Sequence, residues 1–304
     1  MKFFNLIKNK KIIFSISSLL LGLSLIGIII STLSPSIKKP INLGMDFLGG
    51  NEIRIERECL NECSVIRSDQ LVKNIRNISN NNLLNNISFQ IQNNNKLISI
   101  RTPFISLEES ENLLKDINNV VGPLNFESKS SRSIGPKLGK KLLINGGISL
   151  IVSLLAISLY LSIRFDNKFA LLALAALFHD LFIVFGIFSW LGIILSVEVN
   201  SLFAVSLLTI AGYSVNDTVV IFDRIRENIR LNDKNQINEN IELSVNESLR
   251  RTLFTSLTTL IPLSTLILFG SYTLFWFSVS LALGIIIGSY SSILLAPCLL
   301  LEDN

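Results

Sequence analysis

Six long runs of apolar residues dominate this sequence of 304 residues and limit what it can fold into. The hydrocarbon core of a bilayer is about 30 Å thick, so a helix needs about 20 apolar residues to cross it. Only a helix satisfies its own backbone groups without water. Six runs reach this length, at about 12–33, 142–163, 169–194, 200–222, 252–269 and 273–300. We therefore expect an α-helical polytopic membrane protein with six transmembrane helices.

The composition agrees with two environments, a bilayer and water. Only 16% of the residues are charged and 49% are hydrophobic, whereas a soluble chain carries about 25% charged residues. The polar residues gather at 34–141, a segment rich in Asn. The net charge of +4 is scattered, with no aromatic residues between basic ones, which argues against nucleic-acid binding.

The basic residues of the short loops predict the orientation. Lys and Arg precede the first span, lie between the second and third, and flank the loop after the fourth, whereas 192–200 and 270–272 contain none. Because cytoplasmic loops carry the excess of basic residues, both termini, 1–11 and 302–304, are expected in the cytoplasm. The segment 34–141 is then outside. The apolar core of the first span exceeds the roughly 7–15 residues of a cleaved signal, so we interpret it as a retained anchor.

The outer segment reads as a small α+β domain. Glu52–Glu56 alternate polar and apolar residues as a half-buried strand does. Ile87–Gln92 and Lys96–Arg101 are predicted to form a hairpin across Asn93–Asn95. Helical spacing predicts helices at Ser68–Ile78 and Leu107–Val120. A last strand is expected at Leu124–Ser128. Ser106 and Glu109 have the spacing of a capping box. The order βαββαβ predicts a ferredoxin-like domain.

The three cysteines leave one question open. Cys59 and Cys63 lie in the outer segment, and Cys298 lies in the last apolar run. Cys59 and Cys63 could pair in an oxidising compartment, but the sequence does not decide it. The spacing of cysteines and His179 gives no metal site, and we expect no cofactor.

Asp217 is the most informative ionisable residue. An ionisable side chain within a span costs about 2.5–3.5 kcal/mol, so each one needs a reason. On a helix, Ser206, Tyr213, Ser214 and Asp217 fall within about 60° of one direction. This polar stripe on the fourth span should face protein or water.

The fifth span offers a counterpart. One face of that helix carries the polar and helix-breaking residues Arg251, Thr255, Thr258, Pro262 and Thr265. Pro262 leaves the Thr258 carbonyl without its usual donor. Arg251 near the cytoplasmic end has the alternative of extending to water. Burial favours a neutral Asp217 and a nearby arginine favours the carboxylate, and this balance suits proton loading and release. The alternative is a static bond between helices.

His179 and Asp180 lie together about ten residues into the third span. They either relay protons or join helices by a hydrogen bond. The run Asp223–Asn228 reads as a solvated face at the cytoplasmic boundary. We find no phosphate-binding glycine loop, nucleophile elbow or metal-ligand spacing, so we do not expect an enzyme.

Several motifs resemble the SecD and SecF family of protein-export membrane proteins. The segment Gly44–Gly50 is similar to that family's GxDFxGG signature, through Gly44, Asp46, Phe47, Gly49 and Gly50. Four further segments resemble the family around the later spans: Gly212–Val220 continuing through Asp223–Asn228, Ser133–Gly139, Phe178–Asp180, and Arg251–Ser256. The resemblance covers about Gly44–Pro297. The sequence departs from the pattern in its Asn-rich outer helices and in Cys59 and Cys63.

The resemblance implies an auxiliary subunit of the Sec translocase in the bacterial inner membrane, with its outer domain in the periplasm. Such proteins belong to the proton-driven RND superfamily. They work with SecD, beside the SecYEG channel and often YajC, on the translocating polypeptide among membrane lipids. The implied role is to couple the proton motive force to late translocation and release.

By the same resemblance, Asp217 and Arg251 would couple protons. The expected supporting polar residues are His179, Asp180, Tyr213, Ser214, Asn216 and Thr255. Two alternatives remain open, a proton-coupled exporter of small molecules or lipids, and a scaffold without an energetic role.

Overall fold

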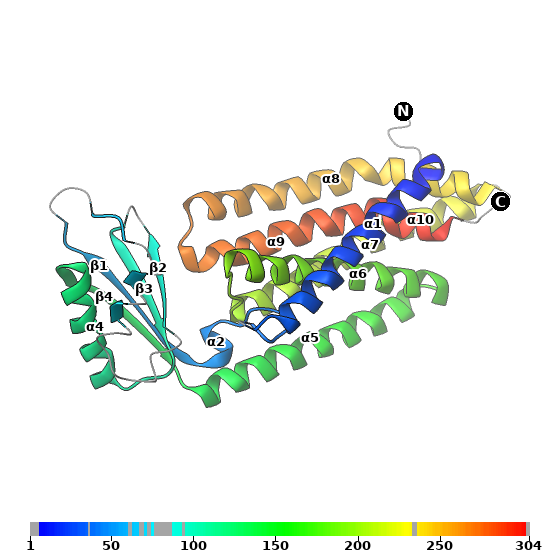
Figure 1. The fold of residues 1–304 in the computed structure, drawn as a ribbon. Coiled ribbons are helices and arrows are strands. Elements are labelled where there is room, and N and C mark those ends of the chain that lie inside the picture. The colour runs from blue at the N-terminus through cyan, green and yellow to red at the C-terminus, as the bar shows by residue number, and fades with distance from the viewer. Residues whose placement is uncertain are drawn as a thin grey trace. The chain divides into compact units, whose positions relative to one another are not determined.

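The computed structural model describes residues 6–35, 37–59, 63–66, 70–71, 74–75, 87–92, 95–232 and 236–301. The chain divides into two compact units (Figure 1). The helical unit comprises Met1–Asn42 and Gly146–Asn304, and the sheet unit comprises Leu43–Asn145.

Within the described residues, six helical segments are long and apolar enough to cross a membrane, as predicted. They are α1 (Leu6–Leu33), α5 (Pro136–Arg164), α6 (Asn167–Leu195), α7 (Ser201–Leu231), α8 (Ile237–Phe269) and a last span made of α9 (Tyr272–Tyr290), the π-helical turn η3 (Ser291–Leu295) and α10 (Ala296–Leu300). α8 begins 15 residues before the apolar run starting at 252. Its polar first part still buries Ile241 and Val245, and such an apolar stripe stabilises a helix through packing.

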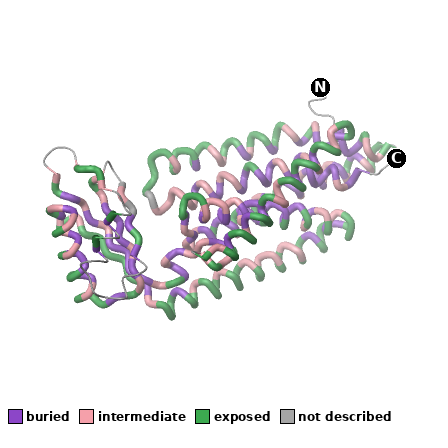
Figure 2. The backbone as a smooth tube through the Cα atoms, viewed as in Figure 1, coloured by how far each residue is buried: buried purple, intermediate pink, exposed green. Residues whose placement is uncertain are grey.

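The spans differ in how much of their surface the chain itself covers. In their most apolar windows, 56% of the residues of α6 and of α7 are buried, against 11% for α8 and 0% for α5 (Figure 2). The residues of α5 and α8 therefore remain available to lipid or to another membrane protein.

The first and last spans lie against each other near the ends that the sequence predicts to face the cytoplasm. The Lys10 Nζ group donates a hydrogen bond to the Leu301 carbonyl over 3.2 Å. Further along, the Tyr290 hydroxyl donates to the Ile13 carbonyl over 3.0 Å. α1 accordingly begins where α10 ends, at one end of the helical unit (Figure 1).

The sheet unit holds four antiparallel strands in the order β2-β3-β1-β4. They are β1 (Gly50–Arg57), β2 (Ser88–Gln92), β3 (Leu97–Thr102) and β4 (Leu124–Ile134). The predicted pairing of the hairpin strands is confirmed, while 93–94 of its turn and most of the helix predicted at Ser68–Ile78 lie outside the described residues. β4 runs six residues past Ser128, because its second half pairs with β1 beyond a register shift between Arg54 and Glu56.

The core of the sheet unit lies between one face of the sheet and α4 (Leu107–Val121). Ile53, Ile55, Ile98 and Ile100 contribute from the strands, together with Leu113, Leu114 and Ile117 from the helix. The alternation predicted for β1 is confirmed, since Ile53 and Ile55 are both fully buried. The capping box is also confirmed, with the Ser106 hydroxyl accepting from the Glu109 backbone and the Glu109 carboxylate accepting from the Ser106 backbone.

The family-like segment Gly44–Gly50 forms a short turn of helix followed by a tight entry into β1. α2 (Met45–Leu48) buries Asp46, which forms an ion pair with Arg132 at 3.2 Å. Gly50 follows with a φ of 144°, and a Cβ atom there would lie 2.6 Å from the Thr102 carbonyl oxygen. This position therefore requires glycine both for its backbone angle and for space.

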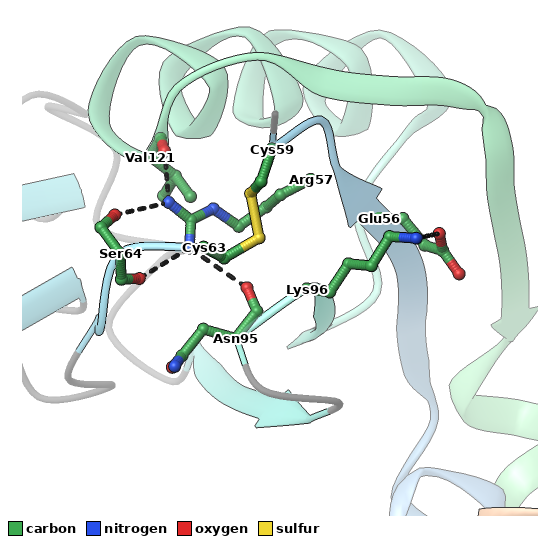
Figure 3. Close-up of a disulfide and its surroundings, with 8 residues drawn as sticks. All are labelled: Glu56, Arg57, Cys59, Cys63, Ser64, Asn95, Lys96 and Val121. Carbon is green, nitrogen blue, oxygen red and sulfur yellow. Dashed lines mark hydrogen bonds and ion pairs between the residues drawn. A yellow bond between two sulfur atoms is a disulfide. The ribbon is translucent and has the colours of Figure 1, made fainter. Parts of the chain in front are cut away.

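Cys59 and Cys63 form a disulfide with a Cα–Cα distance of 5.3 Å (Figure 3). Beside it, the buried Arg57 guanidinium donates to the Ser64 carbonyl and hydroxyl, both at 2.9 Å. It also donates to the Asn95 carbonyl at 3.1 Å and the Val121 carbonyl at 3.0 Å. Arg57 thus ties the disulfide loop to the β2–β3 turn and to the end of α4, and the question that the sequence left open is answered by a disulfide.

Candidate functional site

Asp217 lies on α7 and is only 3% exposed. Among the described residues its Oδ2 atom is buried and has no hydrogen-bond partner. Leaving a buried polar atom unpaired costs about 1–3 kcal/mol. An orphaned carboxyl oxygen in a membrane-spanning helix therefore marks a place where a proton, water or another chain completes the contacts.

Arg251 lies on α8 and is exposed. Its charge acts on Asp217, although within the described part of the chain no ion pair of 4.0 Å or less joins the two. The guanidinium is thus an electrostatic neighbour of the buried carboxyl rather than a direct partner in this state. The coupling role of the two residues stays a prediction.

The predicted polar face of α8 points away from the rest of this chain. Arg251, Thr258, Pro262 and Thr265 are exposed and Thr255 is half-buried. The hydroxyls of Thr255 and Thr258 bond to carbonyls of their own helix. That face does not serve as a counterpart to the α7 stripe within the chain, because helical rotation turns Ser256 rather than Thr255 toward α7.

Tyr213 makes one of the polar contacts between α7 and α8. Its hydroxyl donates to Ser256 Oγ over 3.2 Å, and Ser256 in turn shares a 2.6 Å hydrogen bond with Ser289 of α9. Asn216, on the same helix as Tyr213, is exposed. The sequence singled out Tyr213 as a possible supporting residue, a role that stays a prediction, and it did not identify Ser256 as the partner of Tyr213.

Asp180 is the centre of the buried polar cluster. It is fully buried on α6, and its Oδ2 accepts hydrogen bonds from the Ser214 hydroxyl of α7 and the Ser291 hydroxyl of η3, both 2.6 Å long. Its Oδ1 lies 2.9 Å from Nδ1 of His179. The structure therefore brings three predicted site residues together, His179, Asp180 and Ser214, and adds Ser291.

A second layer of hydroxyls lies beside this cluster. Thr218 Oγ1 and Ser292 Oγ are 2.8 Å apart, and Ser292 donates to the Ser214 carbonyl over 3.2 Å. Sequence reasoning did not identify Thr218, Ser291 or Ser292. The signal that could have found the last two is the polar run Ser289–Ser292 within an apolar span.

The charged run after the apolar part of α7 is more than a solvated face. Asp223 pairs with Arg164 of α5 at 2.6 Å, and Arg224 pairs with Glu247 of α8 at 2.7 Å. Asn228 is buried and donates to Ser244 over 2.9 Å. This run joins α7 to α5 and to α8.

Comparison with known proteins identifies the family. The model for "Protein export membrane protein SecD/SecF, C-terminal" matches residues 113–303. Protein translocase subunit SecF of Prochlorococcus marinus is 46% identical over 302 residues, covering 98% of this chain and 94% of that protein. Protein translocase subunit SecF of Synechocystis is 38% identical over 297 residues, which cover 97% of this chain and 92% of that protein.

A solved structure has the same fold. The crystal structure of SecDF from Thermus thermophilus, a translocon-associated membrane protein, matches with a TM-score of 0.81 at 28% identity. The match covers 98% of this chain and 38% of that longer chain. A second SecDF structure, in a super-membrane-facing form, matches with a TM-score of 0.61. On these similarities, the chain belongs to the SecF family of protein translocase subunits.

Proposed function

We propose that this chain is an auxiliary subunit of the Sec translocase that couples the proton motive force to late translocation and release of secreted polypeptides. The observation that carries the proposal is Asp217, a buried carboxyl with an unpartnered oxygen on a membrane-spanning helix. Ionisable residues in such positions mark proton and ion paths. We propose no hydrolytic step in this chain.

Proton uptake at Asp217 would remove its charge and with it the attraction of Arg251. A chain with two conformations shifts toward the one that binds the proton better, by no more than the difference in proton affinity. If the two conformations open Asp217 to opposite sides of the membrane, a proton gradient drives directed movement. The outer domain would follow and pull on the emerging polypeptide.

The partners belong to this proposal. The exposed polar face of α8 fits a second membrane protein, since polar residues in spans face protein or water. The SecDF chain, of which this chain matches 38%, supports SecD as that partner. SecYEG and YajC follow from the family resemblance, and lipids would cover the apolar remainder.

We also propose that the protein lies in the inner membrane with both termini in the cytoplasm and a ferredoxin-like periplasmic domain. The charge pattern of the loops and the adjacent ends of α1 and α10 support this orientation. The disulfide supports it independently, because disulfides persist in the periplasm. The strand order β2-β3-β1-β4 supports the ferredoxin-like assignment.

The test compares Asp217→Asn with a matched control on the same helix. Asparagine keeps the size of the side chain but cannot titrate. The control is Thr209→Val, because Thr209 is exposed and, among the described residues, its hydroxyl bonds only to the Val205 carbonyl of its own helix. We expect Asp217→Asn to co-purify with SecD and SecY but to lose export stimulation. Normal export by this variant would favour the scaffold, and failure of the native chain to co-purify with SecY would favour the small-molecule or lipid exporter.

A further inference from the structure

The carboxyl of Asp180 collects hydrogen bonds from three separate elements. Its Oδ2 atom accepts hydrogen bonds from the hydroxyls of Ser214 on α7 and Ser291 on η3. Its Oδ1 atom is hydrogen-bonded to Nδ1 of His179 on the same helix. These contacts join α6, α7 and the last span at one point. When the carboxyl is ionised, its hydrogen bonds are about twice as strong as neutral ones.

The imidazole of His179 offers a free acceptor. Facing an ionised Asp180, Nδ1 must carry the proton, because two acceptors do not bond. Nε2 is then a bare acceptor. It is buried, the side chain being 5% exposed, and in the described part of the molecule it has no partner. Buried polar atoms are normally paired, so this nitrogen keeps an unused capacity to bind a proton or accept a hydrogen bond.

The element that Asp180 holds is a π-helical turn, where the Ala296 N–H bonds to the Ser291 carbonyl five residues back. Single π turns within helices are rare and are frequent at functional sites. The Ser291 hydroxyl has one proton and two acceptors, Asp180 Oδ2 at 2.6 Å and the Gly288 carbonyl at 3.1 Å. Its bond to Asp180 therefore competes with a bond inside its own helix.

We propose that His179 and Asp180 form a second proton-exchanging site, whose charge holds the π turn of the last span in place. A proton from water binds Nε2 of His179, and the Nδ1 proton passes to Oδ1 of Asp180. The result is a neutral imidazole protonated at Nε2 and a neutral carboxyl, with one proton gained. Ser291 then turns to the Gly288 carbonyl and frees the π turn. The reverse step releases the proton.

The other charged groups around this site are few. η3 contributes no titratable residue, and Tyr290 of α9 bonds to Ser17 and Ile13 of α1. On α7, Asp217 is one helical turn from Ser214, Tyr213 is adjacent to Ser214, and the charged residues of Asp223–Arg230 lie more than two turns further along; Arg251 of α8 acts on Asp217. α6 itself carries Lys168 near its start, and the titratable residues of α1 and α10 are Lys8, Lys10, Lys11 and Cys298. Of these, Lys10 is engaged with Leu301.

The inference deepens the proposed function and rests on it, because a proton at Asp180 does work only in a proton-coupled subunit. The test uses the full complex with its partner subunits in membranes. Difference infrared spectra are recorded on acidification from about pH 8 to about pH 5, the range in which an ordinary imidazole changes charge. We expect two carboxyl bands, one lost in Asp217→Asn and the other lost in Asp180→Asn.

Two further variants keep the test decisive if Asp180→Asn fails to assemble. His179→Gln retains a hydrogen-bond donor to Asp180 but cannot take up a proton, so it should remove the second band. Ser291→Ala should retain that band but lose the gradient-dependent part of export. Ser280→Ala is the control, because Ser280 is fully buried in α9 and, within the part of the chain that the structure describes, its hydroxyl bonds only to the Phe277 carbonyl of that helix.

The outcomes separate the two claims. An unchanged second band in both Asp180→Asn and His179→Gln, or native export by Ser291→Ala, would overturn this inference and leave the role of Asp217 standing. Gradient-dependent export that survives Asp217→Asn would instead overturn the proposed function. Loss of the second band in His179→Gln with an intact Asp217 band supports the proposal.

Discussion

The Ser214 hydroxyl of α7 donates a 2.6 Å hydrogen bond to Oδ2 of Asp180 on α6. Ser214 lies three residues before Asp217 on α7. Asp180 and Asp217, two of the buried carboxyl groups of the described helical unit, are therefore connected through about one turn of α7, from Ser214 to Asp217. By the mechanism proposed above, a change in the charge of either carboxyl would act on the other through this turn of α7. The polar centre of this protein is better described as two linked carboxyl groups than as one.

The entry into β1 predicts a sharp difference between two glycine substitutions. Gly50 and Gly122 both have positive φ angles, 144° and 93°, but only a Cβ at Gly50 would meet backbone, the Thr102 oxygen at 2.6 Å. Both alanine variants should lose about 1–3 kcal/mol from backbone strain. Gly50→Ala should lose more, because β3 must move. Hydrogen exchange of the β1 and β3 amides measures both, and equal losses would contradict the close approach.

Glu52 predicts a pH dependence of the sheet unit. Burial raises the pKa of Glu52, but the charges of Arg101 and Arg54, with hydrogen bonds from Arg54 and Ser99, outweigh it and hold the pKa below its usual 4.5. A carboxyl whose pKa is lower in the folded chain than in the unfolded chain stabilises the fold at any pH above the unfolded pKa. This stabilisation is lost as the pH falls through the folded pKa. Stability should therefore decrease as the pH falls below 4.5.

The matched variant for this prediction is Glu52→Gln, which should lack that part of the pH dependence. Exchange protection of the β1 amides, corrected for the intrinsic effect of pH on exchange, is the measurement. The account of Glu52 fails if the native chain and Glu52→Gln lose protection in parallel below pH 4.5.

The disulfide makes the proposed orientation testable with the natural cysteines. The chain has three cysteines, and Cys298 is buried. A membrane-impermeant maleimide added outside intact spheroplasts should label Cys59 and Cys63 only after reduction. Cys298→Ala removes any background from the last span. Labelling that requires a permeabilised membrane would place the sheet unit on the wrong side, and labelling before reduction would argue against the disulfide.

The six spans were predictable because the length of an apolar run is a local property of the sequence. The strands were predictable for the same reason, since Ile53 and Ile55 alternate with polar neighbours. The start of α8 was missed because its polar first part depends on burial of Ile241 and Val245. The length of β4 was missed because it depends on pairing with β1.

Only some residues of the candidate site, and few of its contacts, could be predicted from the sequence. Asp217 and Asp180 stand out because charges are expensive in a membrane. That Ser214 and Ser291 bond to Asp180 depends on the relative rotation of three helices, which the sequence does not encode locally. The π turn is likewise a matter of packing, and no helix periodicity within Ser291–Leu295 predicts it. The predicted face of α8 was correct as a polar stripe, yet within this chain it is exposed.

The most direct test of the central claim measures export by reconstituted complexes with and without an imposed proton gradient, comparing the native chain, Asp217→Glu and Asp217→Asn. The account predicts that the gradient stimulates export by the native chain, stimulates it more weakly in Asp217→Glu, which still titrates, and has no effect in Asp217→Asn. Equal stimulation of Asp217→Asn and the native chain would contradict it.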